Sequence, residues 1–377
     1  MYDSKISLAE KITFIIGIIV GLIVLYWISS SNKGNFKFDD LALGEDTISH
    51  FGKVENLHVH CLDESDLYLC LSSYYNYGKN SNVTLWLGNS QLHSINQFKT
   101  GQETATVKLH RLAKKHNQYL FSISQPNANL QEHFLVIAHL IKKIPVKHLI
   151  LPVVFDDMRE DGIRFGLNFL LRDKTTINLI NNYETGVNLL LEDIEKNKNK
   201  NKNKIKSLLD KSEDYLDKKL GSIWSLWSKR PDFRGNFFNF LYKLRNFVFQ
   251  IDPSTTRKIL PGPYKKNFEA LNSIIKIAKD NKINLIIYNV PIRNDFKIPY
   301  NIQHYNKFKK DLNTISSQYS IKFINLENII PNYLWGETYS TSISRKNDID
   351  FMHFKEPGHK ILSEALYSEM VNYWIKN

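Results

Sequence analysis

Short runs of apolar residues alternate along much of the chain with longer stretches in which apolar and polar positions follow a helical period. Five apolar runs have the length of buried strands, at 83–88, 118–124, 147–155, 283–291 and 321–326. Helical stretches lie at about 101–116, 130–143 and 357–374. Such alternation predicts an α/β fold with a parallel sheet covered by helices on both faces. In sheets of this kind, ligands bind at the carboxyl ends of the strands.

Two segments that precede this pattern are also strand-like. Residues 57–61 (LHVHC) alternate, and residues 66–71 (DLYLCL) are mostly apolar. The stretch 183–270 breaks the rhythm, because it holds a Lys/Asn run followed by an aromatic-rich segment. We expect an α-rich insertion there that forms a lid or docking surface over the sheet. Its aromatic side chains either contact sugar rings or a bilayer, or pack as ordinary core.

Residues 12–31 form an uncharged, strongly apolar stretch long enough for a helix to cross a bilayer. A cleaved signal peptide is the alternative, but its apolar region is usually shorter, and no A-x-A-like cleavage site follows here. We therefore expect a cytoplasmic head at 1–11, a transmembrane anchor at 12–31 and a stalk at 32–50. Residues 51–377 are expected to fold as one domain outside the cytoplasm, in a periplasm or at a cell surface.

The cysteine content agrees with that location. Cys61 and Cys70 are the two cysteines of the chain, and both follow the anchor. In an oxidising compartment they can close a small loop, which contributes about 2–3 kcal/mol in the chain-entropy model. Two buried free thiols are the alternative.

Composition and charge exclude some classes of protein. Of 377 residues, 42% are hydrophobic, so the chain can bury a large core and is not a disordered protein. The net charge is +12, and residues 196–206 (KNKNKNKNKIK) contribute six lysines without an acid. Such a charge is compatible with nucleic acid, anionic lipid or an acidic polymer as partner. We interpret the run as a solvated loop and expect no nucleic-acid partner.

Two short motifs far apart in the sequence suggest catalysis. Gly88-Asn89-Ser90 follows the strand VTLWL directly, and Asp350-Phe351-Met352-His353 precedes the last helix. A serine hydroxyl becomes a nucleophile when an imidazole takes its proton, and a carboxylate must orient that imidazole. Because Ser90 follows a buried strand, and because Asp350 and His353 are three apart, the three side chains can meet at one edge of the sheet.

With these motifs the chain resembles the SGNH (GDSL-type) hydrolase superfamily, over about residues 80–177 and 280–377. The resemblance implies a three-layer, flavodoxin-like α/β domain that needs no cofactor. It also implies that Ser90 is the nucleophile, His353 the general base and Asp350 its orienting carboxylate.

The chain departs from the family pattern around the oxyanion hole. Asn89 stands where the family has the Asp of G-D-S. The segment 125–129 (QPNAN) lacks the glycine that follows the second strand, and Phe155-Asp156-Asp157 stands where a G-x-N-D block is expected. An ionised carboxylate at 156 or 157 cannot donate to an oxyanion. We expect the Ser90 N–H and an amide of Asn127 or Asn129 to be the donors, with Asp156 and Asp157 at the substrate edge.

The variant motif blocks, the anchor and the segment 284–296 (NLIIYNVPIRNDF) resemble one membrane-anchored branch of the superfamily. Its members include the D-alanyl transfer protein of lipoteichoic acid synthesis and the alginate O-acetylation proteins. The resemblance implies an acyltransferase or esterase acting on acyl esters, O-acetyl above all, of a cell-surface polysaccharide. The alternative is a catalytically inactive partner of a membrane-bound O-acyltransferase. Gly17 and Gly21 form a G-x-x-x-G pair through which the anchor can contact that enzyme, although chance spacing is the alternative.

Other polar residues have simpler explanations. Strand alternation separates His58 and His60 from Cys61, so we expect no metal site. The acidic residues at 156–161 surround an arginine and are expected to form a solvated loop with an internal ion pair; acid–base catalysis or cation binding by the paired carboxylates is the alternative. His93 is expected on a helix surface or in the pocket, and His359 on the surface of the last helix or lining the cleft.

Overall fold

The computed structural model describes residues 47–183, 255–339 and 347–375, together with residues 17, 21, 241, 244–246 and 248. The chain divides into two compact units. The larger unit comprises residues 43–203, 253–338 and 349–377, and it contains the sheet and the residues discussed below. The smaller unit comprises residues 1–42, 204–252 and 339–348, of which few are described.

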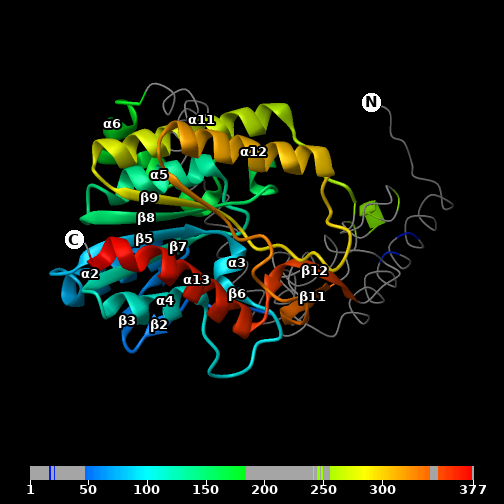
Figure 1. Ribbon diagram of the computed structural model, residues 1–377, viewed down its shortest axis with the longest axis horizontal. Helices are drawn as coiled ribbons and strands as arrows, with labels where there is room; N and C mark the ends of the chain where they lie inside the picture. The colour runs from blue at the N-terminus through cyan, green and yellow to red at the C-terminus, as the bar shows by residue number, and fades with distance from the viewer. Residues whose placement is uncertain are drawn as a thin grey trace, which may run out of the picture. The chain divides into compact units, whose positions relative to one another are not determined.

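A six-stranded parallel sheet forms the centre of the larger unit (Figure 1). Its strands in chain order are β4 (His60–Cys61), β5 (Asn82–Gly88), β7 (Gln118–Ser124), β8 (Val146–Val153), β9 (Asn284–Asn289) and β10 (Lys322–Asn325). Three small two-stranded sheets pair β1 (Ile48–Ser49) with β6 (Ser94–Ile95), β2 (Lys53–Val54) with β3 (Leu57–His58), and β11 (Trp335–Tyr339) with β12 (Asn347–Phe354). The five predicted strands are therefore present, each within two residues of its expected ends.

Helices cover both faces of this sheet (Figure 1). One face carries α5 (Leu130–Leu140), α11 (Pro261–Asp280) and α12 (Ile302–Gln318), and the other carries α4 (Ala105–Lys114) and α13 (Glu356–Ile375). The other helices among the described residues are α2 (Glu64–Tyr77), the short α3 (Ser90–His93), α6 (Lys174–Ile180) and the 3₁₀ turns η2 (Asp157–Arg159), η3 (Phe165–Leu167), η4 (Leu170–Arg172) and η5 (Asn332–Leu334). The helices expected at 101–116, 130–143 and 357–374 correspond to α4, α5 and α13.

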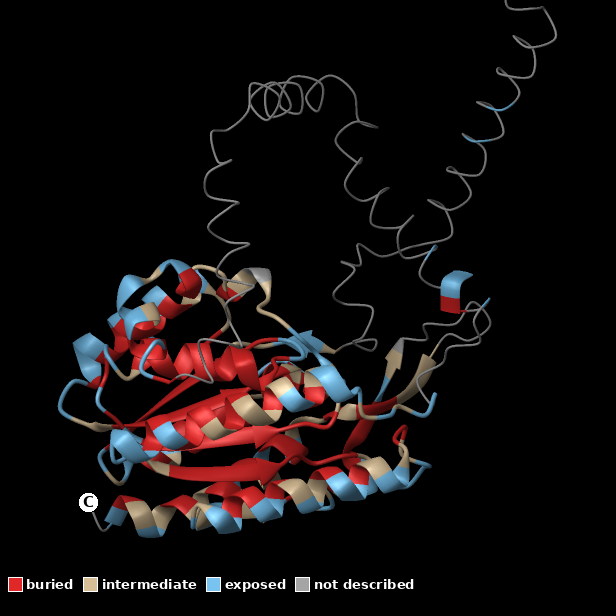
Figure 2. Ribbon diagram, turned by 90° about the horizontal axis from the view of Figure 1, so that it is seen from above, coloured by how far each residue is buried: buried red, intermediate tan, exposed pale blue. Residues whose placement is uncertain are grey.

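The side chains of the central strands alternate for most of their length between two hydrophobic cores. In β5, Leu85 and Leu87 pack in the core under α5 and α11, whereas Trp86 between them packs in the core under α4 and α13. Strands of a parallel sheet are buried on both sides, which is why they are apolar throughout in the sequence. Figure 2 shows the central strands buried along their length, whereas most of the outer helices have an exposed side. This pattern confirms the expected α/β architecture with helices on both faces.

The order of the strands locates a crevice. Across the sheet the order is β10-β9-β8-β5-β7-β4. The chain therefore moves outward from β5 to β7 and then returns past β5 to form β8, which is the flavodoxin-like order with one extra edge strand. Ligands in such folds bind where the direction of winding reverses, at the carboxyl ends of the two strands concerned. In this chain that place lies beyond the ends of β5 and β8.

The prediction of a strand at 66–71 is wrong, because these residues belong to α2. Asp63 caps the helix by accepting hydrogen bonds from the backbone N–H groups of Ser65 and Asp66. The buried side chains Leu67, Cys70, Leu71 and Tyr74 follow at helical spacing. A short apolar run fits either periodicity, and here the capping aspartate decides for the helix.

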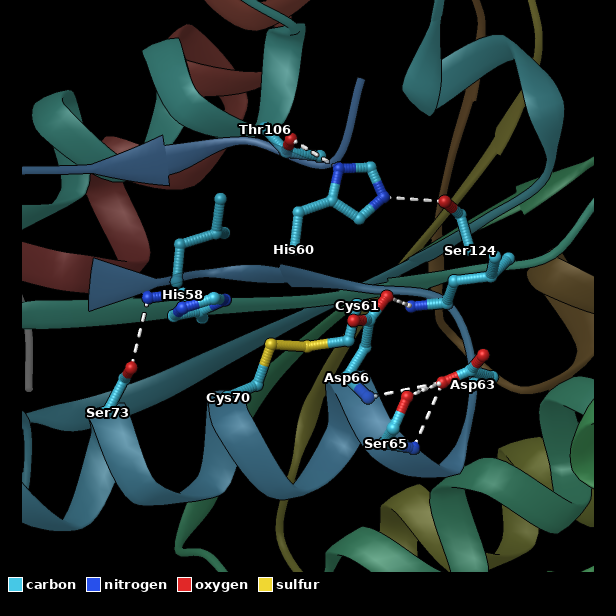
Figure 3. Close-up of a disulfide and its surroundings, with 12 residues drawn as sticks. His58, His60, Cys61, Asp63, Ser65, Asp66, Cys70, Ser73, Thr106 and Ser124 are labelled. Carbon is cyan, nitrogen blue, oxygen red and sulfur yellow. Dashed lines mark hydrogen bonds between the residues drawn. A yellow bond between two sulfur atoms is a disulfide. The ribbon is translucent and has the colours of Figure 1, made fainter. Parts of the chain in front are cut away.

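A disulfide joins β4 to α2 (Figure 3). Cys61 and Cys70 are both fully buried, and their Cα atoms are 6.5 Å apart, within the range that a disulfide spans. The bond fixes the short edge strand β4 against the first turns of α2. Of the two alternatives that the sequence allows for this pair, the structure has the bonded one.

Several sequence predictions lie outside the described residues. These are the anchor at 12–31 apart from Gly17 and Gly21, the stalk up to residue 46, the lysine run at 196–206 and the aromatic segment of the insertion apart from residues 241, 244–246 and 248. Gly17 and Gly21 are helical and exposed. Within the part of the chain that the structure describes, no helix combines the length and apolar character needed to span a membrane.

Candidate active site

Ser90 lies at the crevice beyond β5. The strand ends at Gly88, where a Cβ atom would clash with the side chain of Leu92, so the next turn can close tightly. Asn89 then caps α3, its Oδ1 accepting a hydrogen bond of 3.0 Å from the N–H of Gln91. Ser90 is the first residue of α3 and is only half-buried, whereas Asn89 and Gln91 beside it are buried. The serine hydroxyl is therefore held in place and remains reachable.

Asp350 and His353 both lie in β12, three residues apart, and backbone hydrogen bonds fix the aspartate beside the histidine. Asp350 Oδ1 accepts hydrogen bonds of 2.9 Å from the backbone N–H groups of Met352 and of His353. The other carboxylate oxygen, Oδ2, lies 2.9 Å from His353 Nδ1. These three hydrogen bonds hold the carboxylate against Nδ1 of the imidazole ring.

These three side chains form one continuous chain of hydrogen bonds. His353 Nε2 lies 2.9 Å from Ser90 Oγ, on the side of the ring opposite Asp350. When Nδ1–H donates to Asp350, Nε2 is left to accept the hydroxyl proton of Ser90. Asp350 and His353 are 4% and 6% exposed, so Ser90 is the most accessible of the three. The arrangement can perform nucleophilic attack by serine with histidine as general base.

The electrostatics favour this tautomer. Burial by itself raises the pKa of the Asp350 carboxyl. The charge of His353, its hydrogen bond and the two backbone N–H groups oppose burial and outweigh it, so the pKa of Asp350 lies below its ordinary value. Asp350 is therefore ionised at neutral pH, and it stabilises the imidazolium that His353 becomes when it accepts a proton.

Two residues that the sequence analysis missed hold this constellation together. Asn96 Nδ2 donates to Asp350 Oδ2 at 3.1 Å and to the carbonyl of Glu337 at 3.0 Å. Gln91 Nε2 donates to the carbonyls of Pro291 and Met352, both at 2.9 Å. Gln91 thus ties α3 to the segments after β9 and around His353. Neither residue belongs to a recognisable motif, and only their position soon after Ser90 distinguishes them.

The two asparagines proposed as oxyanion donors differ in their surroundings. Asn129 caps α5, with Oδ1 accepting from the N–H of Glu132 at 3.0 Å and Nδ2 donating to the carbonyl of Gly162 at 2.9 Å. Asn127 is exposed in the turn after β7 and has a positive φ of 52°. The side chain of Asn129 is therefore engaged in structure, and that of Asn127 faces solvent.

The two aspartates after β8 also differ from each other. Asp156 forms an ion pair with Arg257, and its Oδ2 accepts a hydrogen bond of 3.0 Å from the hydroxyl of Tyr300. Asp157 is 6% exposed, and its Oδ2 accepts a hydrogen bond of 2.7 Å from Asn89 Nδ2. The expectation of a solvated loop is wrong for Asp157, because η2 turns this side chain inward toward the residue that precedes Ser90.

Burial is also the main influence on the ionisation of Asp157. It raises the pKa of this carboxyl well above its ordinary value, and the neighbouring charge of Asp156 adds to the rise. The hydrogen bond from Asn89 acts in the opposite direction and does not outweigh burial.

A second contact between serine and histidine lies at the end of β7. Ser124 Oγ, at the end of β7, is 2.5 Å from His60 Nε2 and 2.8 Å from His93 Nδ1 (Figure 3 shows the His60 contact). His60 Nδ1 lies 2.8 Å from the hydroxyl of Thr106. All four side chains are buried, so the expectation that His93 lies on a helix surface or in the pocket is wrong. We call His60, His93 and Ser124 the buried histidine cluster.

His359 is also buried, contrary to the prediction of a surface position or a place lining the cleft. Its Nδ1 accepts from the N–H of Ala105 at 3.2 Å and its Nε2 contacts the carbonyl of Ser94 at 3.1 Å. It therefore joins α13 to α4 and β6. Among the described residues, no group of three or more His, Cys, Asp or Glu side chains is placed to hold a metal ion.

Comparison with known proteins adds little to this geometry. No model of a protein family matches the sequence, and no curated protein sequence does. Among solved structures, one similar chain comes from Bacteroides fragilis NCTC 9343 and is named as a proposed acylhydrolase. It is 11% identical, with a TM-score of 0.37 over 81% of this chain and 97% of that one. A likeness this distant does not identify the activity of the present chain.

Proposed function

We propose that this chain is a serine esterase or O-acyltransferase that works through an acyl-enzyme on Ser90. The observation that carries the proposal is the continuous contact from Ser90 Oγ to His353 Nε2 and from His353 Nδ1 to Asp350, each at 2.9 Å. Ser90 lies at the crevice where the winding of the sheet reverses, which is where substrates bind in folds of this type.

The residues support a two-step reaction. Ser90 Oγ attacks the ester carbonyl while His353 Nε2 takes the hydroxyl proton, and Asp350 stabilises the resulting imidazolium. His353 then gives this proton to the departing alcohol, leaving the acyl group on Ser90. A second alcohol or a water molecule enters, loses its proton to His353 and receives the acyl group. Transfer and hydrolysis differ only in which acceptor enters.

We take the substrate to be an acyl ester, above all an O-acetyl ester, of a cell-surface polysaccharide. The apolar segment 12–31 supports anchoring in a membrane, and the disulfide of Cys61 and Cys70 supports an oxidising compartment. Gly17 and Gly21 would contact a membrane-bound O-acyltransferase. Membrane fractionation of the full chain, followed by co-purification with Gly17→Leu and Gly21→Leu variants, tests both parts of this proposal.

Hydrolysis of p-nitrophenyl acetate by the full chain in detergent tests the chemistry. Ser90→Ala should lower kcat/KM by at least about 10³-fold, because the nucleophile acts with the rest of the triad as one unit. Acetylation of Ser90, detected by mass spectrometry, should disappear in the same variant. Ser124→Ala is the matched control, since it removes a serine hydroxyl that also contacts histidine but is 1% exposed. Full activity in Ser90→Ala would contradict the proposal.

The second candidate is a non-catalytic partner that keeps the fold without turnover. The engagement of Asn129 favours it, because one of the two amides expected to stabilise an oxyanion is already used. This candidate predicts that Ser90→Ala leaves polymer acylation in cells unchanged, whereas deletion of residues 12–31 abolishes it.

A further inference from the structure

We propose that Asp157 carries its proton at neutral pH and donates a hydrogen bond to the oxyanion that forms when Ser90 attacks an ester. This inference rests on the proposed function, and it assigns a catalytic role to a side chain that as a carboxylate could only accept hydrogen bonds. It also supplies the donor that Asn129 does not provide.

Position is the first argument. Asp157 follows β8 and Ser90 follows β5, and these neighbouring strands border the crevice. The side chain of Asn89 connects the two sites: its Oδ1 accepts from the N–H of Gln91, and its Nδ2 donates to Asp157 Oδ2 at 2.7 Å. The side chain of Asn89 therefore links Asp157 through two hydrogen bonds to the backbone of the turn that carries Ser90.

The second argument is that the surrounding cations have other partners. Arg257 pairs with Asp156, Lys266 on α11 pairs with Asp161, and Arg164 pairs with Glu132. Arg159, which follows in η2, lies 3.6 Å from Asp156 and donates to the carbonyl of Lys258. No cation in the described part of the chain forms an ion pair with Asp157.

The third argument is that ionisation would be costly at this position. Burying an unpaired carboxylate is strongly unfavourable, and such a group takes up a proton instead. The charges of Asp156 and, less strongly, Glu160 add repulsion, while the hydrogen bond from Asn89 and the charge of Arg164 act in the opposite direction without outweighing burial. A neutral carboxyl can keep Oδ2 as the acceptor for Asn89 and present the proton on Oδ1, which makes no hydrogen bond to any described residue.

The proton balance of the reaction is unaffected by this role. The proton of Ser90 moves to His353 Nε2 as the bond from Oγ to carbon forms, and the carbonyl electron pair moves to oxygen. Asp157 keeps its own proton and shares it with that oxygen in a hydrogen bond. A donor already in place before charge develops is the arrangement that stabilises such intermediates most.

The test is the pH dependence of kcat/KM for p-nitrophenyl acetate between about pH 5 and pH 10, with Ser90→Ala as the blank. In the wild type, kcat/KM should fall as rising pH removes the proton from Asp157. Asp157→Asn keeps a donor that cannot ionise, so this alkaline fall should disappear while activity at neutral pH drops less than about tenfold. Asp157→Ala removes the donor and should lose about 10²–10³-fold. Asp161→Asn, the same change in the exposed acid paired with Lys266, should keep the wild-type profile.

Two results would overturn the inference: equal losses in Asp157→Asn and Asp157→Ala, or an alkaline fall that persists in Asp157→Asn. Thermal unfolding of each variant separates loss of fold from loss of the donor. The carboxyl ¹³C shift of Asp157 at neutral pH reports the proton without any turnover. If the ¹³C shift shows a protonated Asp157 but turnover does not depend on Ser90, both the proposed function and the donor role are rejected. Asp157 would then be only a buried, protonated acid. An ionised shift alongside Ser90-dependent turnover would reject the inference alone.

Discussion

Two serine–histidine contacts lie at the same end of the sheet. Their distances are similar, but they differ in the group on the far side of the histidine and in the exposure of the serine. Ser90 Oγ is 2.9 Å from His353, and Ser124 Oγ is 2.8 Å from His93. His353 has a carboxylate on its far side, and its serine is half-buried. In the buried histidine cluster the far side of His60 contacts the hydroxyl of Thr106, and Ser124 is 1% exposed.

The comparison shows what a nucleophile needs beyond proximity to an imidazole. In the first pair, the carboxylate stabilises the cation that forms when histidine accepts a proton. In the second, burial lowers the pKa of His60 to about 3 and that of His93 well below its ordinary value, so both imidazoles stay neutral. The surroundings of His353 therefore stabilise an imidazolium during a reaction, whereas those of His60 and His93 disfavour one.

The largest expected effect comes from removing the carboxylate beside His353, because the Ser90–His353 pair then lacks a negative charge, as the buried histidine cluster does. Asp350→Asn removes the negative charge and allows the wrong tautomer of His353, so kcat should fall by about 10³–10⁴-fold with KM little changed. Steady-state kinetics on an ester substrate measure this. The matched control is Asp311→Asn, which removes a half-buried acid of α12 that pairs with Lys307 and accepts a hydrogen bond from the hydroxyl of Tyr264. Comparable losses in both variants would show that Asp350 has no special role.

The next effect concerns acid and the buried histidine cluster. Because folding depresses the pKa of His60, the unfolded chain takes up a proton below about pH 6.5 that the native chain refuses until about pH 3. Stability therefore falls as the pH falls through this window, by about 2 kcal/mol at pH 5 for such a histidine. In His60→Gln, denaturant unfolding should lose less stability between pH 7 and pH 5 than in the wild type. An identical loss in both proteins would place the acid sensitivity elsewhere.

A smaller effect is expected from the residue that positions the carboxylate. Asn96→Ala removes the bond to Asp350 Oδ2 and the tie to Glu337, and should lower kcat about tenfold while leaving KM unchanged. Asn294→Ala removes an exposed asparagine that contacts Asn328 and serves as the control. A change in KM without a change in kcat would argue that Asn96 shapes the substrate site instead of positioning Asp350.

The smallest effect on turnover should come from Ser124→Ala. It leaves His60 Nε2 and His93 Nδ1 without their shared partner, so the free energy of unfolding should fall by about 1–3 kcal/mol. Activity at neutral pH should stay within about threefold, because the Ser90 pair keeps all its own contacts. A loss of activity as large as that of Ser90→Ala would mean that the two pairs work together.

The sequence predicted much of this arrangement, because strands buried on both faces and helices with one apolar stripe have distinct patterns. It also singled out Ser90, Asp350 and His353, whose roles depend on residue type and on position relative to a strand and a helix. Residues 66–71 were mistaken for a strand because their run is short enough to fit either period.

What the sequence could not indicate are properties that arise only in three dimensions. Asp157 and His93 are charged or polar residues that patterns place on the surface, and both are buried by elements distant in the chain. Asn96 and Gln91 act through backbone carbonyls of segments about 200 residues or more away, and such contacts leave no mark on local composition.

The separation of the two parts of the site has a consequence for biosynthesis. The serine and its histidine stand 263 positions apart in the chain. At about 5–20 residues per second, translation reaches His353 roughly 13 to 50 s after it passes Ser90. During that interval the nascent chain carries a hydroxyl with no base to activate it. The ability to be acylated therefore arises only once position 353 has been made, and shortened translation products that stop before it would be chemically silent.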